Sequence, residues 1–492
     1  MSLKKNAIAG VKWTTIGTIG RSIFQLLQVS ILARFLPKEA FGLVAMTLFV
    51  VNLTNIFVDM GMSSAILHRQ DATVNEYSSL YWFNILVSII LYIAIFLGAP
   101  LVALFYKEPA LELLIPILGV NLLLMATGRQ HRTIMQKQFQ FKLIAINEFI
   151  SYFVGLITAI ILAMKDFGVY SLVYSTLLSS LISNGLFLIQ NLHLNPIKFH
   201  FNRIEIKPFL KIGSFSMGSS LLDFFSSEID ILIIGKMLGS ESLGIYSLAK
   251  QIVQKIYLIV NPIVITVLSP ILSSIQKDKD KVKYYYLLVI YHLSSINFPV
   301  YLLVIVLSRE ILSVFFGYNY TSGFLILSFL AIYYCTNTIS NPVGSLQIAT
   351  GRTDLGFKWT IIRVILAPLF IYLASFINVN AVAASIALLS LLLTIPMWKI
   401  QLKPMANIKL KEYLKQFFIP YMLFLLISAL FVIFEHLYEL QFNIIINAII
   451  KASIAMVMYF GFLWVLDKKR IIEIYSLMLS QMKVVNSRFK SI

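Results

Sequence analysis

Hydrophobic stretches long enough to cross a bilayer recur along the whole chain, and the first of them carries a regular polar stripe. From Val11 to Leu36 the residues are mostly apolar, and at about 1.5 Å per residue a helix of this length crosses the hydrocarbon core. Polar residues recur within it at spacings of four, three, four and three, which places them on one helical face: Thr14, Thr18, Arg21, Gln25 and Gln28. Because a polar face does not pack against lipid, we expect this stripe to face other helices or a wet cavity.

The same pattern returns about 202 residues later. Shifting the first stretch onto residues 212–244 aligns the stripe with five further polar residues: Ser216, Ser220, Asp223, Ser227 and Asp230. The turn that follows also matches, since Arg34, Leu36, Glu39, Gly42 and Leu43 fall on Lys236, Leu238, Glu241, Gly244 and Ile245. We interpret this as an internal repeat, with a cation at the middle of the polar face in the first copy and anions in the second.

The hydropathy pattern predicts fourteen membrane-spanning helices. The expected spans are 11–35, 41–66, 78–105, 110–128, 143–164, 167–190, 210–236, 242–270, 284–308, 322–348, 356–377, 379–398, 413–434 and 443–466. Basic residues alternate between the connections, so that 28 of the 40 fall on one side and seven on the other. By the positive-inside rule, both termini are expected in the cytoplasm.

An even number of predicted spans separates the two repeats, so both should enter the membrane in the same direction. This arrangement implies two lobes related by a pseudo-twofold axis along the membrane normal. We therefore expect an all-α polytopic membrane protein in three parts. These are an N-lobe of six helices over 1–205, a C-lobe of six helices over 206–404, and a C-terminal helix pair with a basic tail over 405–492.

Composition supports this class of protein and excludes several others. The chain is 59% hydrophobic and 13% charged, which is typical of a polytopic membrane protein. Its net charge of +18 is spread over alternating loops, which argues against a nucleic-acid partner. The single cysteine, Cys335, excludes a disulfide within the chain. No Walker A, HExxH or GxSxG motif occurs, so we expect no catalytic residue, metal site or cofactor, and no enzyme activity.

Charged residues inside predicted spans are the strongest functional signal, because each costs roughly 2.5–3.5 kcal/mol to insert at a helix centre. Arg21, Lys250 and Arg363 are the candidate cations of a cavity. The polar side chains expected to line that cavity are Gln25, Gln28, Asn52, Asn55 and Gln254. The candidate residues for a coupling ion are Asp59, Asp223 and Asp230. The alternative is mutual pairing, such as Arg21 with Asp59 or Lys250 with Asp223, which would neutralise buried charge.

Five fragments of the first 140 or so residues point to a family. They read GVKWTTIGTIGR, ILARFLPKEAFGLVAM, FVDMGMSSAILHRQ, SSLYWFN and GRQHRTIMQKQFQF. Together they resemble the polysaccharide transporter family, which is the Wzx-type branch of the multidrug/oligosaccharidyl-lipid/polysaccharide exporter superfamily. Within this family the resemblance is to colanic acid and lipopolysaccharide exporters, and the fourteen expected spans extend it over the whole chain.

The resemblance implies a flippase of the bacterial inner membrane. Such a protein moves undecaprenyl-pyrophosphate-linked oligosaccharide repeat units to the outer leaflet by alternating access, for O-antigen, capsule or exopolysaccharide synthesis. The implied partners are this lipid-linked oligosaccharide, membrane lipids, a coupling proton or sodium ion, and polysaccharide polymerase machinery. Arg21 matches the cavity arginine expected in the first helix of the family, and with Lys250 it would attract the pyrophosphate. Related lipid II flippases carry an acidic residue directly after this arginine, whereas this chain has Ser22. The resemblance therefore does not specify which residues contact the phosphate.

Two other classes of membrane protein are alternatives. A drug or metabolite antiporter of the same superfamily usually has twelve spans, so the expected helix pair at the C-terminus argues against it. A membrane-embedded polysaccharide polymerase or ligase should carry a large outer loop with catalytic polar residues. The outer loops of this chain are only a few residues long, so the flippase is the interpretation that we favour.

Overall fold

The computed structural model describes residues 3–193, 195–437 and 443–473. Within these ranges the chain forms helices and no strand, as expected for an all-α membrane protein. The elements, in chain order, are α1 (Leu3–Leu32), α2 (Lys38–Asp59), α3 (Met62–His68), α4 (Val74–Tyr106), α5 (Leu111–Lys137), α6 (Phe141–Met164), α7 (Tyr170–Leu192), α8 (Arg203–Ser274), α9 (Lys279–Val306), α10 (Ser308–Phe316), η1 (Tyr318–Gly323), α11 (Phe324–Ser340), α12 (Val343–Thr350), α13 (Thr353–Ser375), α14 (Val379–Leu392), α15 (Thr394–Met397), η2 (Trp398–Leu402), α16 (Lys403–Ala406), α17 (Leu410–Lys415), α18 (Phe418–Leu437) and α19 (Ile444–Leu466).

Ten segments of the described residues are long and apolar enough to cross a membrane. Three further helices cover the remaining expected spans: α1, the shorter apolar helix α18, and α8, whose 72 residues include two of the expected spans. The chain is therefore a polytopic membrane protein, and the number of fourteen spans stays a prediction.

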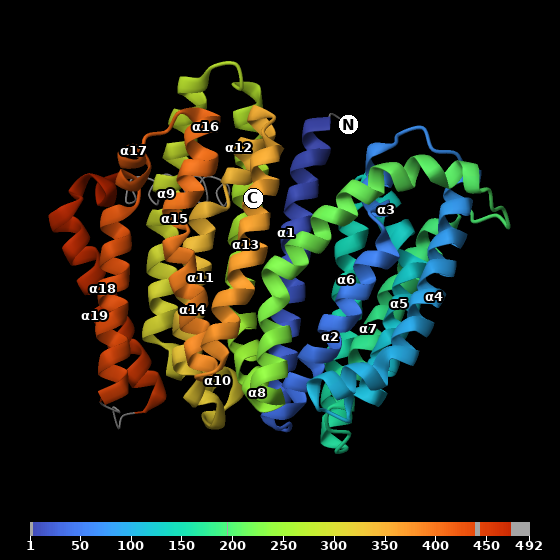
Figure 1. The fold of residues 1–492 in the computed structure, drawn as a ribbon, viewed down its shortest axis with the longest axis horizontal. Coiled ribbons are helices and arrows are strands. Elements are labelled where there is room, and N and C mark those ends of the chain that lie inside the picture. The colour runs from blue at the N-terminus through green and yellow to red at the C-terminus, as the bar shows by residue number, and fades with distance from the viewer. Residues whose placement is uncertain (1–2, 194, 438–442, 474–492) are drawn as a thin grey trace, which may run out of the picture. The chain divides into compact units, whose positions relative to one another are not determined.

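Two glycines with left-handed backbone shape the membrane helices. Gly239 (φ 79°, ψ 179°) divides α8 into two arms, 203–238 and 240–274, and the ribbon reverses its direction part-way along α8 (Figure 1). Gly61 (φ 68°) follows Met60 (φ 44°) and separates α2 from α3. The expected single span 41–66 is thus interrupted. A Cβ at Gly61 would lie 2.2 Å from the carbonyl oxygen of Gly213 on α8, so the break permits a close backbone contact.

The chain divides into two compact units, and unit 1 contains Met1–Ile252, Phe315–Gly317 and Thr360–Val382. Within unit 1, α5 packs against α2, α4 and α7, and α6 packs between α1 and α7. The apolar core of this bundle is made by Val51 and Val58 of α2, Leu114, Leu118 and Leu122 of α5, and Val173 of α7. On α2 and α5 these residues lie four or seven apart, which is the spacing of one buried face.

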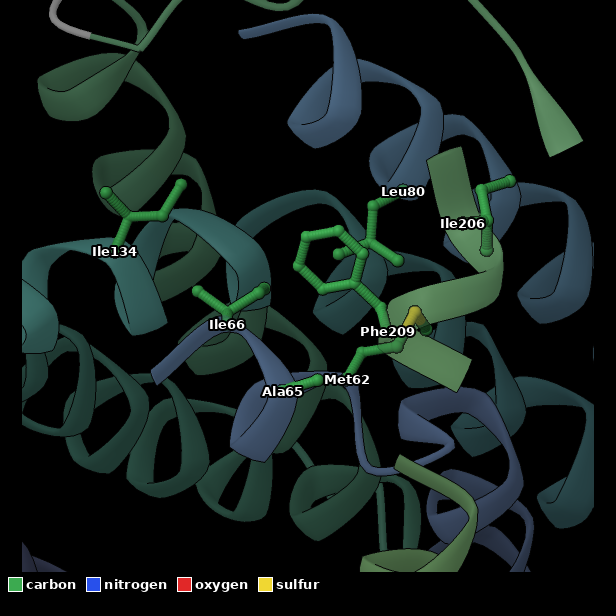
Figure 2. Close-up of a cluster of buried hydrophobic side chains, with 7 residues drawn as sticks. All are labelled: Met62, Ala65, Ile66, Leu80, Ile134, Ile206 and Phe209. Carbon is green, nitrogen blue, oxygen red and sulfur yellow. The ribbon is translucent and has the colours of Figure 1, made fainter. Parts of the chain in front are cut away.

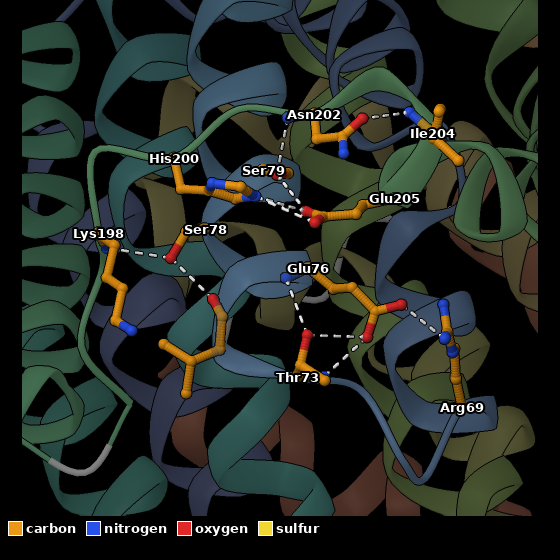
Figure 3. Close-up of polar contacts among 11 residues, drawn as sticks. Arg69, Thr73, Glu76, Ser78, Ser79, Lys198, His200, Asn202, Ile204 and Glu205 are labelled. Atoms are coloured by element: carbon orange, nitrogen blue, oxygen red, sulfur yellow. Dashed lines mark hydrogen bonds and ion pairs between the residues drawn. The ribbon is translucent and has the colours of Figure 1, made fainter.

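The connection between α7 and α8 is fastened to the helices of unit 1. Phe209 at the start of α8 is fully buried and enters an apolar cluster with residues of α3, α4, α5 and α8 (Figure 2): Met62, Ala65, Ile66, Leu80, Ile134 and Ile206. Beside it, Ser79 of α4 donates a hydrogen bond to Glu205 at 2.6 Å, and His200 lies 3.0 Å from the same carboxylate (Figure 3). The hydrogen bond from Ser79 has the larger effect and the contact with His200 the smaller one, and both lower the pKa of Glu205 below its ordinary value.

A capping box starts α4 close to this connection. Thr73 accepts a hydrogen bond from the backbone of Glu76, and the Glu76 carboxylate accepts one from the backbone of Thr73 at 2.8 Å. Arg69 also reaches Glu76, with Nη2 at 2.6 Å from Oε1 (Figure 3). The start of α4 is therefore well defined, and from it Ser79 holds Glu205 and Ser78 accepts a hydrogen bond from the backbone of Lys198 at 3.0 Å.

Unit 2 contains Val253–Val314, Tyr318–Trp359 and Ala383–Ile492, and is built around α9. Helices α11, α18 and α19 pack against α9. Two charged contacts hold the C-terminal helices. Lys451 of α19 pairs with Glu310 at 2.6 Å, and the fully buried Arg470 stacks on Tyr291 and donates to Ser294 Oγ at 2.9 Å.

The division into compact units differs from the expected division into lobes, because residues 206–252 belong to unit 1. A compact unit reflects which helices touch in one conformation, whereas the expected lobes reflect the sequence repeat. The lobe boundaries at 205 and 404 therefore stay a prediction.

Candidate functional site

Arg21 lies on α1 where this helix packs closely against α6. A Cβ at Gly17, one turn earlier, would lie 3.2 Å from the Cβ of Ala145, so small residues allow the close approach. Arg21 is half-buried and makes a side-chain hydrogen bond with Tyr152 of α6. The polar stripe of α1 therefore faces a neighbouring helix at this point.

Two arginines of α5 extend the positive charge from α6 toward α2. Arg132 donates from Nη2 and Nε to Oε1 of Glu148, at 2.8 and 3.2 Å, and Glu148 lies on α6 one turn before Tyr152. Arg129 Nη1 lies 3.5 Å from Oδ1 of Asp59 on α2, and Arg129 also donates to Asn55 Oδ1. The two ion pairs place one arginine against α6 and the other against α2.

We call Arg21, Arg129, Arg132, Asp59 and Glu148 the arginine cluster. Tyr152 interacts electrostatically with Arg21, Glu148 and Arg132, and Arg132 in turn interacts electrostatically with Arg129, which joins the pair of Arg129 and Asp59 to the rest of the cluster. Three guanidinium groups face two carboxylates, so the cluster carries one excess positive charge when the carboxylates are ionised. A cation in a region of low dielectric constant attracts anions strongly, and the forked donors of arginine match the oxygens of a phosphate.

The sequence pattern did not predict that Arg129 and Arg132 belong to this site, because both lie in the expected cytoplasmic connection between spans 110–128 and 143–164. In the structure α5 continues to Lys137 and carries both arginines on its last turns. Their spacing of three was the available signal, since it places two cations on one face of a continuing helix.

The other candidate cavity residues of the first two spans have different surroundings. Gln28 donates to Ser175 Oγ on α7 at 2.9 Å, so it joins two helices of unit 1. Asn55 accepts from Arg129 in the arginine cluster. Gln25 is half-buried on α1, and Asn52 is exposed on α2. Of these four residues, Asn55 joins the arginine cluster by a described contact, and Gln28 joins α7.

Lys250 lies in a second charged cluster, formed entirely by the two arms of α8. It is 5% exposed and donates to Asp230 Oδ1 at 2.9 Å, to Glu228 Oε2 at 3.1 Å and to the carbonyl of Ser227 at 2.8 Å. Tyr246 donates to the other oxygen of Asp230 at 2.6 Å. An ammonium group has three donors, so in this conformation the partners on α8 account for all of them.

The acidic neighbour of Lys250 is thus not the one suggested by the sequence. The alternative of mutual charge pairing named Asp223 as the partner of Lys250, but Lys250 pairs with Asp230 and Glu228. Asp223 is exposed and interacts with Arg363 of α13 instead. Gln254 lies one turn after Lys250 on α8 and is half-buried. Among the described residues, no group of three or more His, Cys, Asp or Glu is placed to hold a metal ion.

The fold is similar to those of two solved transporter structures. One is a lipid II flippase, MurJ, in an inward closed conformation, with a TM-score of 0.72 and 16% identity over 94% of this chain and all of that one. The other is a multidrug resistance MATE family transporter in an inward-facing conformation, with a TM-score of 0.63 and 15% identity over 77% of this chain and 93% of that one. At these identities the likeness concerns the fold alone.

Curated relatives are similar over most of their length. The chain is 26% identical to the lipopolysaccharide biosynthesis protein WzxC of Escherichia coli over 86% of each protein. It is 30% identical to the teichuronic acid biosynthesis protein TuaB of Bacillus subtilis, over 73% of this chain and 74% of that protein. Residues 31–324, more than half of the chain, match the family described as polysaccharide biosynthesis protein. Because of the match to TuaB and the match to the family model, the chain belongs to the polysaccharide biosynthesis protein family.

Proposed function

We propose that this protein moves a lipid-linked oligosaccharide, carried on undecaprenyl pyrophosphate, from the cytoplasmic to the outer leaflet of the bacterial inner membrane. The observation that carries the proposal is the arginine cluster, which brings three guanidinium groups together in a membrane protein of a polysaccharide biosynthesis family. Both termini would be cytoplasmic, because the basic residues divide 28 to seven between the two faces.

In this proposal the pyrophosphate binds at the arginine cluster. Asp59 and Glu148 hold Arg129 and Arg132 in position before the substrate arrives. A pyrophosphate competes with these carboxylates, because its oxygens accept the same forked hydrogen bonds and carry more charge. Arg21, whose described partner is the neutral Tyr152 hydroxyl, supplies the excess charge that attracts the anion.

The relatives support a transporter rather than an enzyme. One of them is the succinoglycan biosynthesis transport protein ExoT of Rhizobium meliloti, 23% identical over 73% of each chain. A multidrug transporter shares the fold, so the fold alone does not distinguish the two transport classes. The family membership favours the lipid-linked oligosaccharide over a drug, and the flipped unit would then pass to polymerase machinery.

For the coupling ion, a proton or sodium, the structure favours one candidate carboxylate over the other two. Both oxygens of Asp230 accept hydrogen bonds within α8. Asp59 accepts from Ser63 at 2.6 Å and faces Arg129. Asp223 is exposed and faces the cation Arg363, so we propose that Asp223 is the residue that an entering ion reaches.

Deleting the gene should cause the parent cells to accumulate the undecaprenyl-pyrophosphate-linked repeat unit and to lose the surface polymer. The repeat unit would still be made inside but would no longer reach the outer leaflet. Lipid extraction with mass spectrometry measures the first effect, and staining of the cell surface measures the second. Restoring the wild-type gene is the control. Surface polymer at the parental level together with no lipid-linked intermediate in the deletion strain would contradict the proposal.

A further inference from the structure

The turns that begin the second helix of each repeat lie against each other in unit 1. A Cβ at Gly42 would lie 1.9 Å from the carbonyl oxygen of Ser240. A Cβ at Gly244 would lie 1.9 Å from the carbonyl oxygen of Lys38. No side chain fits at either place, because a Cβ requires more than 3 Å from such an oxygen. The two backbones therefore touch directly, as helices do where small residues line a crossing.

The two contacts are equivalent under the sequence repeat. The offset of 202 residues carries Lys38 onto Ser240 and Gly42 onto Gly244, so each contact becomes the other. Phe41 and Leu243 also correspond, and both are buried, with 4% and 0% of their surface exposed. A contact that maps onto itself in this way is isologous, as at the twofold axis of a dimer.

The glycines are required by space and not by backbone conformation. Neither Gly42 nor Gly244 has a positive φ, so any residue could adopt the backbone there. The turns before them are set differently in the two repeats: Pro37 precedes α2, and Gly239, with φ 79°, precedes the second arm of α8. An ion pair between Lys38 and Glu241, with Nζ 3.7 Å from Oε1, joins the same two turns at the surface.

We propose that this paired glycine contact is the outer gate of the transport path, which closes the path in this conformation and must part for release to the outer leaflet. The inference rests on the proposed function. The two turns lie between expected spans 1 and 2 and between spans 7 and 8, on the face with few basic residues. The helices that carry the repeated polar stripes meet there, so parting the contact opens the path between the stripes. Closely packed interfaces switch between discrete arrangements and do not deform continuously, so a close backbone contact suits a gate that is either closed or open.

The test introduces two cysteines by Lys38→Cys and Glu241→Cys, in a Cys335→Ser background that has no other thiol. A short, cleavable thiol cross-linker should join them in isolated membranes. The cross-linked protein should lose export by about tenfold or more and regain it when the linker is cleaved, because a gate held shut removes one of the two states needed for transport. Export at the full rate while cross-linked would overturn the proposal.

Adding Gly42→Ala or Gly244→Ala to the cysteine pair should lower the cross-linking yield and make the introduced thiol at position 38 react with an impermeant maleimide from outside. The two substitutions should act alike, and combining them should add little, because either one already prevents closure. Gly98→Ala in α4 is the matched control, since a Cβ there meets no atom within 4 Å. If both alanine variants cross-link with the same yield as the Gly98→Ala control, this result would also overturn the proposal.

These measurements distinguish the gate from the proposed substrate. Cross-linking and labelling use membranes without substrate, so they report the gate even if the transported molecule is a different one. If an alanine variant does not accumulate in the membrane, the cross-linked protein with both glycines intact still decides the question.

Discussion

Replacing Arg21 with alanine should abolish export of the repeat unit while the protein still inserts and folds. The substitution removes the excess charge of the arginine cluster, and two arginines paired with two carboxylates remain. A hydrogen bond to a charged group is worth about 1.5–3 kcal/mol, so losing the two forked bonds of one guanidinium should reduce export by about 100-fold or more. Arg21→Lys should retain part of the activity, because lysine keeps the charge but loses the planar fork.

Matched variants separate substrate binding at Arg21 from a structural role. Tyr152→Phe removes the described partner of Arg21 and leaves the charge, so it should keep most of the export. Lys12→Ala removes an exposed cation from the same helix and should have little effect. Export is measured in cells with protein abundance in parallel. Recovery when Arg21→Ala is combined with Glu148→Gln, Asp59→Asn or Asp223→Asn would favour charge pairing, and full export by Arg21→Ala alone would refute both roles.

Replacing Lys250 with methionine should strongly destabilise the folded protein. Asp230 and Glu228 would then be left without their cation inside α8. Removing one partner of a buried ion pair typically costs about 3–5 kcal/mol, because the remaining charge stays buried and uncompensated. Thermal unfolding of the detergent-solubilised protein measures the effect, and Lys411→Met, an exposed site, is the control. An unfolding midpoint equal to that of the wild type would contradict the prediction.

The neutralised variant Lys250→Met/Asp230→Asn/Glu228→Gln extends this test to function. It removes all three charges together, so it should recover most of the lost stability. If export recovers as well, the triad of Lys250, Asp230 and Glu228 is structural. If stability recovers and export does not, Lys250 also contacts the substrate during the cycle, as its position on a polar helix face suggests.

The helices and the repeat could be predicted from the sequence, because both depend on spacing along the chain. The polar stripe at Arg21 and the match of Gly42 with Gly244 are visible as periodicity and as an offset. The arginine cluster could not be found in this way, because its ion pairs join α5 to α2 and α6, and the packing of separate helices decides which side chains meet.

The partner of Lys250 could have been predicted by counting from the turn at Gly239. Lys250 lies eleven residues after this glycine and Asp230 nine before it, so at about 1.5 Å per residue both are roughly 15 Å from the turn. Asp223 lies sixteen residues before the turn, or about 24 Å away along the helix. The expected spans 210–236 and 242–270 already place the reversal between these two helices, around Gly239, so the count needs no information beyond the sequence.

The measurement that tests the central claim most directly is lipid flipping by the purified protein in liposomes. The substrate is the undecaprenyl-pyrophosphate-linked oligosaccharide extracted from the parent cells, and a glycan-digesting enzyme added outside reports which molecules have reached the outer leaflet. With a proton or sodium gradient imposed, wild-type vesicles should be digested to near completion. Vesicles without protein, or with Arg21→Ala, should stop at the fraction that began in the outer leaflet. Equal digestion in wild-type and protein-free vesicles, with the protein folded, would contradict the account.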